Sequence, residues 1–130
     1  MVERQGIAAQ GGGSRYSYSP GLRSGGMLYV SGQVPIDPLT GDKPAEFSDQ
    51  VRLALENVRR VAAAAGGRLQ DAVRVGVYLA DLANFEAMDQ IYRTFFEDPL
   101  PARTTIQAGL NAVDIEIDAI IALDAECSGR

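Results

Sequence analysis

Arg103 is the residue whose type and place in this sequence best suggest a chemical role. It opens a short extended stretch that ends at Gln107, directly after the Pro99-Leu100-Pro101 segment. Two prolines restrict the chain and lack a backbone N–H, so they hold the approach to this stretch extended. A guanidinium fixed there can bind a planar carboxylate through two parallel hydrogen bonds. The alternative is that Arg103 is an ordinary solvated arginine.

The chain contains no histidine, which removes several classes of catalytic site together. Ser-His-Asp and Cys-His nucleophile pairs are excluded, as are histidine-based zinc or iron sites. A carboxylate site for magnesium or calcium stays possible, but no segment has the spacing of a calcium loop. We therefore expect no metal and no cofactor, and chemistry that uses arginine, carboxylate, hydroxyl or backbone groups. Cys127 is the single cysteine, so it cannot form an intrachain disulfide, and we expect it to be inert.

Length and charge narrow the class of protein further. The 130 residues fit one domain, numbered 1–130, whose glycine-rich segment 1–14 we expect to be flexible. Twelve basic and seventeen acidic residues give a net charge of −5, which counts against a nucleic-acid partner. No apolar run approaches the roughly 20 residues of a membrane span. The N-terminus lacks the apolar core of a signal peptide, so we predict a cytoplasmic protein with no membrane partner.

Hydrophobic spacing predicts the elements that must position these residues. Alternation predicts strands at residues 15–19, 27–31, 73–79, 103–108 and 115–126. Helical spacing predicts helices at residues 47–65 and 82–95, with Asp81 as the N-cap of the second. Turn signals occur at Pro20-Gly21 and at Ser24-Gly25-Gly26. The order β-β-α-β-α-β-β, with a further strand possible at the start, predicts a mixed sheet with both helices on one face.

The other face of this sheet is then expected to mix charged and bulky apolar side chains. Its members would be Met27, Tyr29, Ser31, Arg74, Tyr78, Arg103, Thr105, Glu116, Asp118, Ile120 and Ala122. Such a face would be an unusually large patch in water, so we expect a symmetric oligomer that packs these faces together. Arg103 and Glu116 would then lie on neighbouring strands, in or beside a subunit interface.

Several segments, taken in order, match one known family. They are Tyr18, residues 27–35 (MLYVSGQVP), residues 38–41 (PLTG), Gln50, residues 55–58 (LENV), residues 81–85 (DLANF), residues 101–104 (PART) and residues 115–120 (IEIDAI). The set resembles the Rid (reactive intermediate deaminase) family, which is also labelled endoribonuclease L-PSP or translation-initiation inhibitor. The resemblance covers Arg15 to Asp124 in one register, apart from a shortened turn near residues 109–112.

The resemblance implies a chorismate-mutase-like α/β (α+β) single domain that forms a homotrimer with sites between subunits. It also implies cofactor-independent hydrolysis of enamines and imines, such as 2-aminoacrylate and 2-iminopropionate, to 2-keto acids and ammonia. Position by position, Arg103 matches the arginine that holds the substrate carboxylate, and Glu116 matches the glutamate that positions or activates water. Tyr18 matches a tyrosine that lines the site, and Ser31-Gly32 matches the pair beside it.

The sequence departs from the family pattern at three places. Thr105 replaces the usual cysteine two positions after the arginine, and its hydroxyl and backbone still suit substrate binding. Asp89 replaces an asparagine and adds a negative charge where an anionic substrate approaches. Tyr16-Ser17 replaces the usual Gly-Pro, so Tyr16 competes with Tyr18 for the tyrosine position, although alignment with Ser31 favours Tyr18.

Two other functions stay open at this point. The first hypothesis is a trimer that binds small keto acids as a sensor or partner protein, without turnover. The departures from the family pattern at Thr105 and Asp89 are consistent with it. The family labels also suggest RNA cleavage or translation inhibition. The acidic charge, the missing histidine and the lack of an aromatic and basic surface count against that activity.

Overall fold

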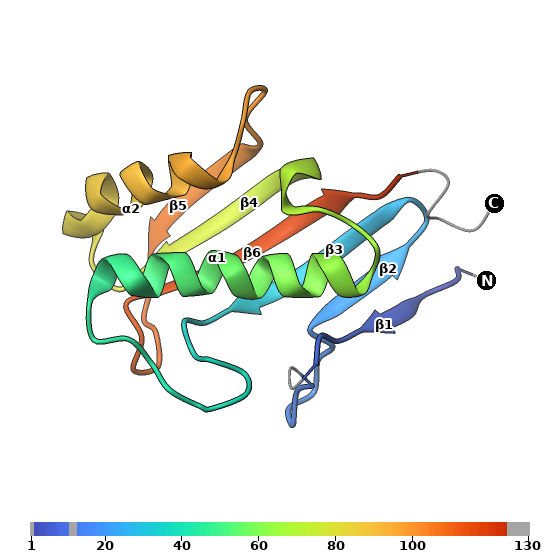
Figure 1. Cartoon of the computed structure of the whole chain (residues 1–130), viewed down its shortest axis with the longest axis horizontal. Coiled ribbons are helices and arrows are strands. Elements are labelled where there is room, and N and C mark those ends of the chain that lie inside the picture. The colour runs from blue at the N-terminus through green and yellow to red at the C-terminus, as the bar shows by residue number, and fades with distance from the viewer. Residues whose placement is uncertain (1, 11–12, 125–130) are drawn as a thin grey trace.

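Within residues 2–10 and 13–124, which the computed structural model describes, six strands form one mixed sheet in the order β1-β2-β3-β6-β4-β5 (Figure 1). The strands are β1 (Gln5–Ile7), β2 (Gly21–Ser24), β3 (Met27–Gln33), β4 (Ala72–Leu79), β5 (Ala102–Gln107) and β6 (Ile115–Ala122). Only the β4–β5 pair is parallel among these strands. Both helices, α1 (Phe47–Ala64) and α2 (Phe85–Tyr92), cover one face, as the sequence predicts.

Helix α1 forms because its apolar residues recur on one stripe. Val51, Leu55 and Val58 are fully buried, and the helix lies across β3 and β6 (Figure 1). The helix also ends within one residue of the predicted end, which precedes the Gly66-Gly67 pair. Gly66 adopts a left-handed conformation with φ +76°, which a glycine reaches without strain.

The predicted second helix is split into three short pieces. Asp81 caps the first, because its Oδ1 accepts a hydrogen bond from the backbone N–H of Ala83 at 2.9 Å. A 3-10 turn at Leu82–Asn84 precedes α2, and another at Arg93–Phe95 follows it. The spacing predicts an inner stripe of Leu82, Phe85, Met88, Tyr92 and Phe95. Met88 and Tyr92 are buried as this stripe requires, whereas Leu82 and Phe85 are exposed and do not belong to it.

The N-terminal strands lie elsewhere than predicted. Residues 15–18 form bends and residue 19 has no regular structure, and the strand begins at Gly21, where the sequence predicted a turn. A Cβ at Gly21 would lie 2.7 Å from Val61 Cγ1, so the glycine lets β2 pass directly beneath α1. Strand β1 lies inside the segment expected to hold no packed element, and Gln5 pairs with Arg23 of β2. The turn at Gly25-Gly26 is confirmed.

The alternation of residues 73–79 predicts that Val73 faces the core, but an irregularity in β4 turns it outward. The pairing of β4 with β6 shifts between Ala72 and Arg74, so Ala72 is buried and Val73 is 46% exposed. A bulge of this kind turns one extra residue out of the ladder. Cys127 lies outside the described residues. None of the described helices is both long enough and apolar enough to cross a membrane.

Candidate functional site

The strand register separates Arg103 from Glu116. Arg103 pairs with Val75, and Thr105 pairs with Val77, so both face the helices together with these buried valines. Glu116 pairs with Tyr78 on the opposite face, which we call the open face. The prediction that Arg103, Thr105 and Glu116 share one face is therefore wrong, and β4 lies between β5 and β6. Alternation alone does not fix which face an edge strand presents until its register is known.

Arg103 is enclosed by side chains of the α2 segment, and we call this group with Thr105 the Arg103 site. Its Nη1 donates a hydrogen bond to Asp89 Oδ1 at 2.8 Å. The guanidinium carbon lies 4.6 Å from the ring centroid of Tyr92 and 5.5 Å from that of Phe85. Rings at these distances attract a cation through their negative faces. Arg103 is thus neither a free nor an ordinary solvated arginine.

The electrostatics of the Arg103 site keep Asp89 ionised. The hydrogen bond from Arg103 holds the pKa of Asp89 below its ordinary value, although partial burial acts in the other direction. Burial raises the pKa of Tyr92 to about 12, against the opposing charge of Arg103. The Tyr92 hydroxyl and Thr105 Oγ1 are both buried and have no hydrogen-bond partner among the described residues. Both atoms are closed off from solvent, so a ligand reaches them only if neighbouring side chains move.

Glu116 lies in a recess that a glycine creates on the open face, and we call Glu116 with Ser31 and Gly32 the Glu116 site. A Cβ at Gly32 would lie only 2.1 Å from Glu116 Oε2, so no larger residue fits there without moving the carboxylate. Glu116 makes no hydrogen bond or ion pair with any described residue. Burial, and secondarily the negative charge of Asp118, raises the pKa of Glu116 above its ordinary value. A half-buried carboxylate with a raised pKa and no partner is suited to take up and release a proton.

Asp118 lies two residues further along the same face but is held differently. The Tyr78 hydroxyl donates a hydrogen bond to Asp118 Oδ2 at 2.8 Å, and this bond raises the pKa of Tyr78. A Cβ at Gly76 would lie 2.3 Å from Asp118 Oδ1. Glycines on both neighbouring strands thus make room for the two acidic residues of β6, but only Asp118 has a partner.

The loop that carries Tyr18 is tied to the Glu116 site by Ser31. The Ser31 hydroxyl donates to the Ser19 carbonyl at 2.7 Å, and the Ser31 N–H donates to the Pro20 carbonyl at 2.9 Å. Ser31 therefore anchors this loop to β3, and its role in a site stays a prediction. Tyr18 is 54% exposed, and its role in a site stays a prediction.

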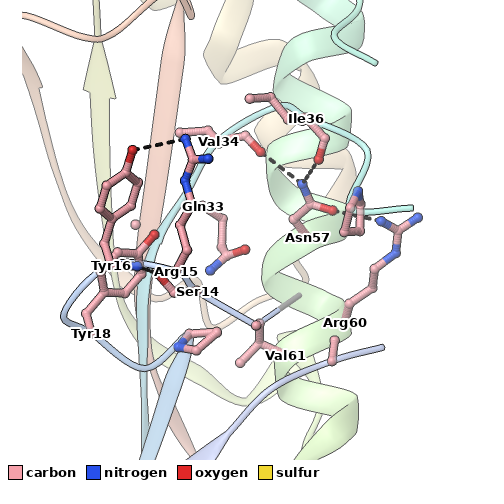
Figure 2. A pocket seen from close by; sticks show the side chains of 15 residues that line it. Ser14, Arg15, Tyr16, Tyr18, Gln33, Val34, Ile36, Asn57, Arg60 and Val61 are labelled. Atoms are coloured by element: carbon pink, nitrogen blue, oxygen red, sulfur yellow. Dashed lines mark hydrogen bonds between the residues drawn. The ribbon is translucent and has the colours of Figure 1, made fainter. Parts of the chain in front are cut away.

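A hollow of about 440 Å³ lies between this loop, the segment after β3 and helix α1 (Figure 2). Tyr16 and Tyr18 both line it, and the Tyr16 hydroxyl accepts a hydrogen bond from Arg15 at 3.1 Å. Asn57 on the opposite wall donates to the carbonyls of Val34 and Ile36, as Figure 2 shows. Residues of the hollow other than Tyr16, Tyr18 and Gly32 were not predicted as site residues, because they come from segments far apart in the sequence.

The predicted site residues thus form two groups in one chain. The first group consists of Arg103 and Thr105 on the edge strand β5 and Asp89 on α2 above it. Sequence reasoning missed the aromatic neighbours of Arg103, which are Phe85 and Tyr92. The spacing of these two rings around Asp89 on one helix was the available signal. Gly32 lies against Glu116 in the second group. Among the described residues no cluster of three or more His, Cys, Asp or Glu side chains could hold a metal ion.

Comparison with known proteins places the chain among established relatives. The family model described as endoribonuclease L-PSP matches residues 12–123. A RutC family protein of Pyrococcus horikoshii is 39% identical over 106 residues, which are 79% of this chain and 84% of that protein. TdcF of Escherichia coli K12, whose name assigns it provisionally to the reactive intermediate deaminases, is 37% identical over 108 residues, with the same shares of the two chains.

The fold is also that of solved structures. The crystal structure of E. coli TdcF with bound serine superposes with a TM-score of 0.86 and 34% sequence identity. The match covers 92% of this chain and 99% of that chain. The described sheet and helices therefore form a mixed α+β domain of a known type.

Proposed function

The chain belongs to the endoribonuclease L-PSP family, also called the Rid family, and we propose that it hydrolyses reactive enamine and imine intermediates to 2-keto acids and ammonia. The observation that carries the proposal is the state of Glu116. It is a half-buried carboxylate without a partner among the described residues, and burial raises its pKa. Few structural roles need such a group, whereas a general acid and base does.

The proposed reaction also needs a group that binds the carboxylate of the substrate, which we call the carboxylate clamp, and Arg103 supplies this group. Its charge, the two aromatic rings and the buried Thr105 hydroxyl suit a small ligand with a planar carboxylate. Such a clamp orients the ligand, and orientation accounts for a large share of enzymatic rate acceleration.

In one chain the sheet lies between Arg103 and Glu116, so we infer that the complete site forms between two copies. Apolar side chains on the open face support a contact there, since Tyr29 and Ile106 are each 45% exposed. A contact that joins the β5 edge of one copy to the open face of another is head-to-tail, and such contacts form a ring when the rotation closes and a filament when it does not. We propose the ring. A homotrimer is the smallest such ring, and each of its interfaces would hold one site.

The proposed reaction balances without a co-reactant other than water. The enamine CH2=C(NH2)–COO⁻ takes a proton at its terminal carbon and becomes an iminium. Glu116 takes a proton from water while the water oxygen bonds to the iminium carbon, which gives a carbinolamine. Glu116 then returns the proton to nitrogen, and ammonia leaves as the C–N bond breaks. The hydroxyl proton passes to solvent as the C=O bond forms, which replaces the solvent proton that the enamine carbon took up, and the carboxylate of the 2-keto acid stays on Arg103.

The test measures 2-keto acid formation from 2-aminoacrylate that a lyase generates in the same solution. We expect a rate well above background, and a fall of about 10²-fold in kcat/KM for Arg103→Ala, because the clamp orients the substrate. Arg52→Ala, which removes an exposed arginine of α1, is the matched control and should leave the rate unchanged. A wild-type rate equal to background would contradict the proposal.

Mixing two inactive variants tests whether the site is shared between copies. Arg103→Ala and Glu116→Ala subunits are unfolded together, mixed in equal amounts and refolded. If sites form between copies, about one quarter of the interfaces regain both wild-type residues, and activity returns. If the mixture stays as inactive as either variant alone, the shared site is wrong.

One observation favours a second candidate function. Arg103 is already bonded to Asp89, so a carboxylate site that binds keto acids without turnover would fit the same geometry. Thermal stabilisation by 2-oxobutyrate, with no rate above background, would favour this carboxylate-binding protein.

A further inference from the structure

Asp89 lies in the position where it competes with a ligand for Arg103. Its Oδ1 accepts from Arg103 Nη1 at 2.8 Å, and its Oδ2 accepts from Arg93 Nη2 at 3.2 Å. The side chains of Arg103 and Asp89 are 19% and 29% exposed, whereas that of Arg93 is 72% exposed. Water therefore screens the Arg93 contact far more than the Arg103 contact.

The aromatic rings decide where a ligand can approach Arg103. Tyr92 and Phe85 lie 4.6 and 5.5 Å from the guanidinium carbon, so they restrict access to the faces of the group. A carboxylate must then bind at the N–H edge in the plane of the guanidinium, and Asp89 already accepts from one N–H of that edge. A ligand carboxylate on Arg103 would therefore lie close to the carboxylate of Asp89.

We propose that Asp89 is a specificity-determining residue, which makes the Arg103 site prefer ligands with a cationic nitrogen next to the carboxylate over simple keto acids. The inference rests on the proposed function, since it takes Arg103 as the carboxylate clamp. A 2-keto acid carries a net charge of −1 and no donor for Asp89. A protonated 2-imino or 2-amino acid carries no net charge, and its nitrogen can donate to Asp89.

The charge of Asp89 then makes the site bind the substrate more tightly than the product. The protonated imine has both partners, because its carboxylate meets Arg103 and its nitrogen meets Asp89. Hydrolysis removes that nitrogen, so the keto acid keeps its attraction to Arg103 and gains an uncompensated repulsion from Asp89. Product therefore leaves more readily than it would from a site with a neutral side chain at this position.

The experiment compares two ligands of one carbon skeleton by calorimetric titration. The ligands are 2-oxobutyrate and L-2-aminobutyrate, which differ at the second carbon in charge and donors. Asp89→Asn should raise the affinity for 2-oxobutyrate by about tenfold and should not raise the affinity for L-2-aminobutyrate. The reason is that a hydrogen bond to an ionic partner changes a binding constant by about one factor of ten. Glu86→Gln removes an exposed carboxylate from the same helix and should change neither affinity by more than about twofold.

Two further variants separate charge from shape. Asp89→Glu keeps the charge, so it should keep the wild-type preference between the two ligands. Asp89→Ser removes the charge with a small side chain, so it should shift the preference as Asp89→Asn does, even if the asparagine variant does not fold. If Asp89→Glu shifts the preference as much as Asp89→Asn, charge is not the cause and the inference is overturned.

The outcome also distinguishes this inference from the proposed function. If Arg103→Ala abolishes binding of both ligands while Asp89→Asn keeps the wild-type preference, the clamp stands and the role of Asp89 is wrong. If Arg103→Ala binds both ligands as tightly as wild type, the clamp itself fails, and the inference falls with it.

Discussion

The Arg103 site and the Glu116 site differ in how their charged groups are held. Arg103 is surrounded by side chains, with Asp89 at 2.8 Å and Tyr92 beneath the guanidinium. Glu116 is half-buried with its carboxylate packed against Gly32, and no described residue forms a hydrogen bond or ion pair with it. From this contrast we infer that a side chain that binds a ligand and a side chain that transfers protons need opposite surroundings. A clamp gains from fixed partners, whereas a group that exchanges protons gains from having none that stabilise one charge state.

The largest effect on activity is expected when Glu116 itself is replaced. Glu116→Gln keeps the shape but cannot take a proton, so we expect kcat to fall by about 10²-fold or more. Wild-type activity should also fall as the pH drops through the raised pKa of Glu116, at a pH above the ordinary value of 4.5. A pH profile of kcat for the wild type and the variant checks both. An acid limb that persists unchanged in Glu116→Gln would assign the limb to another group.

A smaller effect is expected when the space around Glu116 is filled. Gly32→Ala places a Cβ 2.1 Å from Glu116 Oε2, so the carboxylate must move, and we expect kcat to fall by roughly 10- to 100-fold. Gly26→Ala is the matched control, because a Cβ there meets no atom within 4 Å. Equal activity in the two variants would mean that the position of Glu116 is unimportant.

Removing the partner of Arg103 should affect stability as well as ligand preference. Asp89→Asn should lower the free energy of unfolding by about 1 kcal/mol near neutral pH, because a partly buried ionic contact is weakened. The pKa of Asp89 is lowered in the folded state, so this stabilisation is present above the unfolded pKa and is lost as the pH falls through the folded one. Urea titrations of both proteins at one chain concentration and several pH values test it. A difference that does not shrink in acid would point to shape and not charge.

The smallest effect is expected on the stability of the protein when Glu116 is replaced, and its sign is opposite to that expected for Asp89→Asn. The folded state raises the pKa of Glu116, so it binds the proton more tightly than the unfolded chain, and the ionised form costs stability at neutral pH. Glu116→Gln should therefore slightly raise the unfolding free energy at pH 7. The gain should vanish as the pH falls below the ordinary value of 4.5. A loss of stability at pH 7 would show that Glu116 has a stabilising partner.

The main elements were predictable, because they depend on local patterns. The periodicity of α1, the strand at β3 and the segment around Arg103 are each visible within about ten residues of sequence. Family resemblance then supplied roles for Arg103 and Glu116. The first strand was misplaced because the alternation of Tyr16 and Tyr18 was a stronger signal than that of β2, which depends on contact with α1.

The relative placement of the site residues was not predictable, because it depends on long-range pairing. Val75 opposite Arg103 fixes the face of β5, and no local pattern within β5 contains that information. The ion pair between Asp89 and Arg103 likewise joins residues fourteen positions apart. The sequence indicated only that Asp89 added negative charge near a ligand.

The recess formed by Gly32 also limits how this protein can change over generations. Alanine at position 32 and glutamate at position 116 compete for one volume, so the two positions cannot vary independently. A larger residue at position 32 requires either a shift of the Glu116 carboxylate or a shorter side chain at position 116. Either change disturbs the proposed proton-transfer group, so selection for the proposed activity would act against it. Gly32 is therefore held in place by a side chain on another strand, although it performs no chemistry itself.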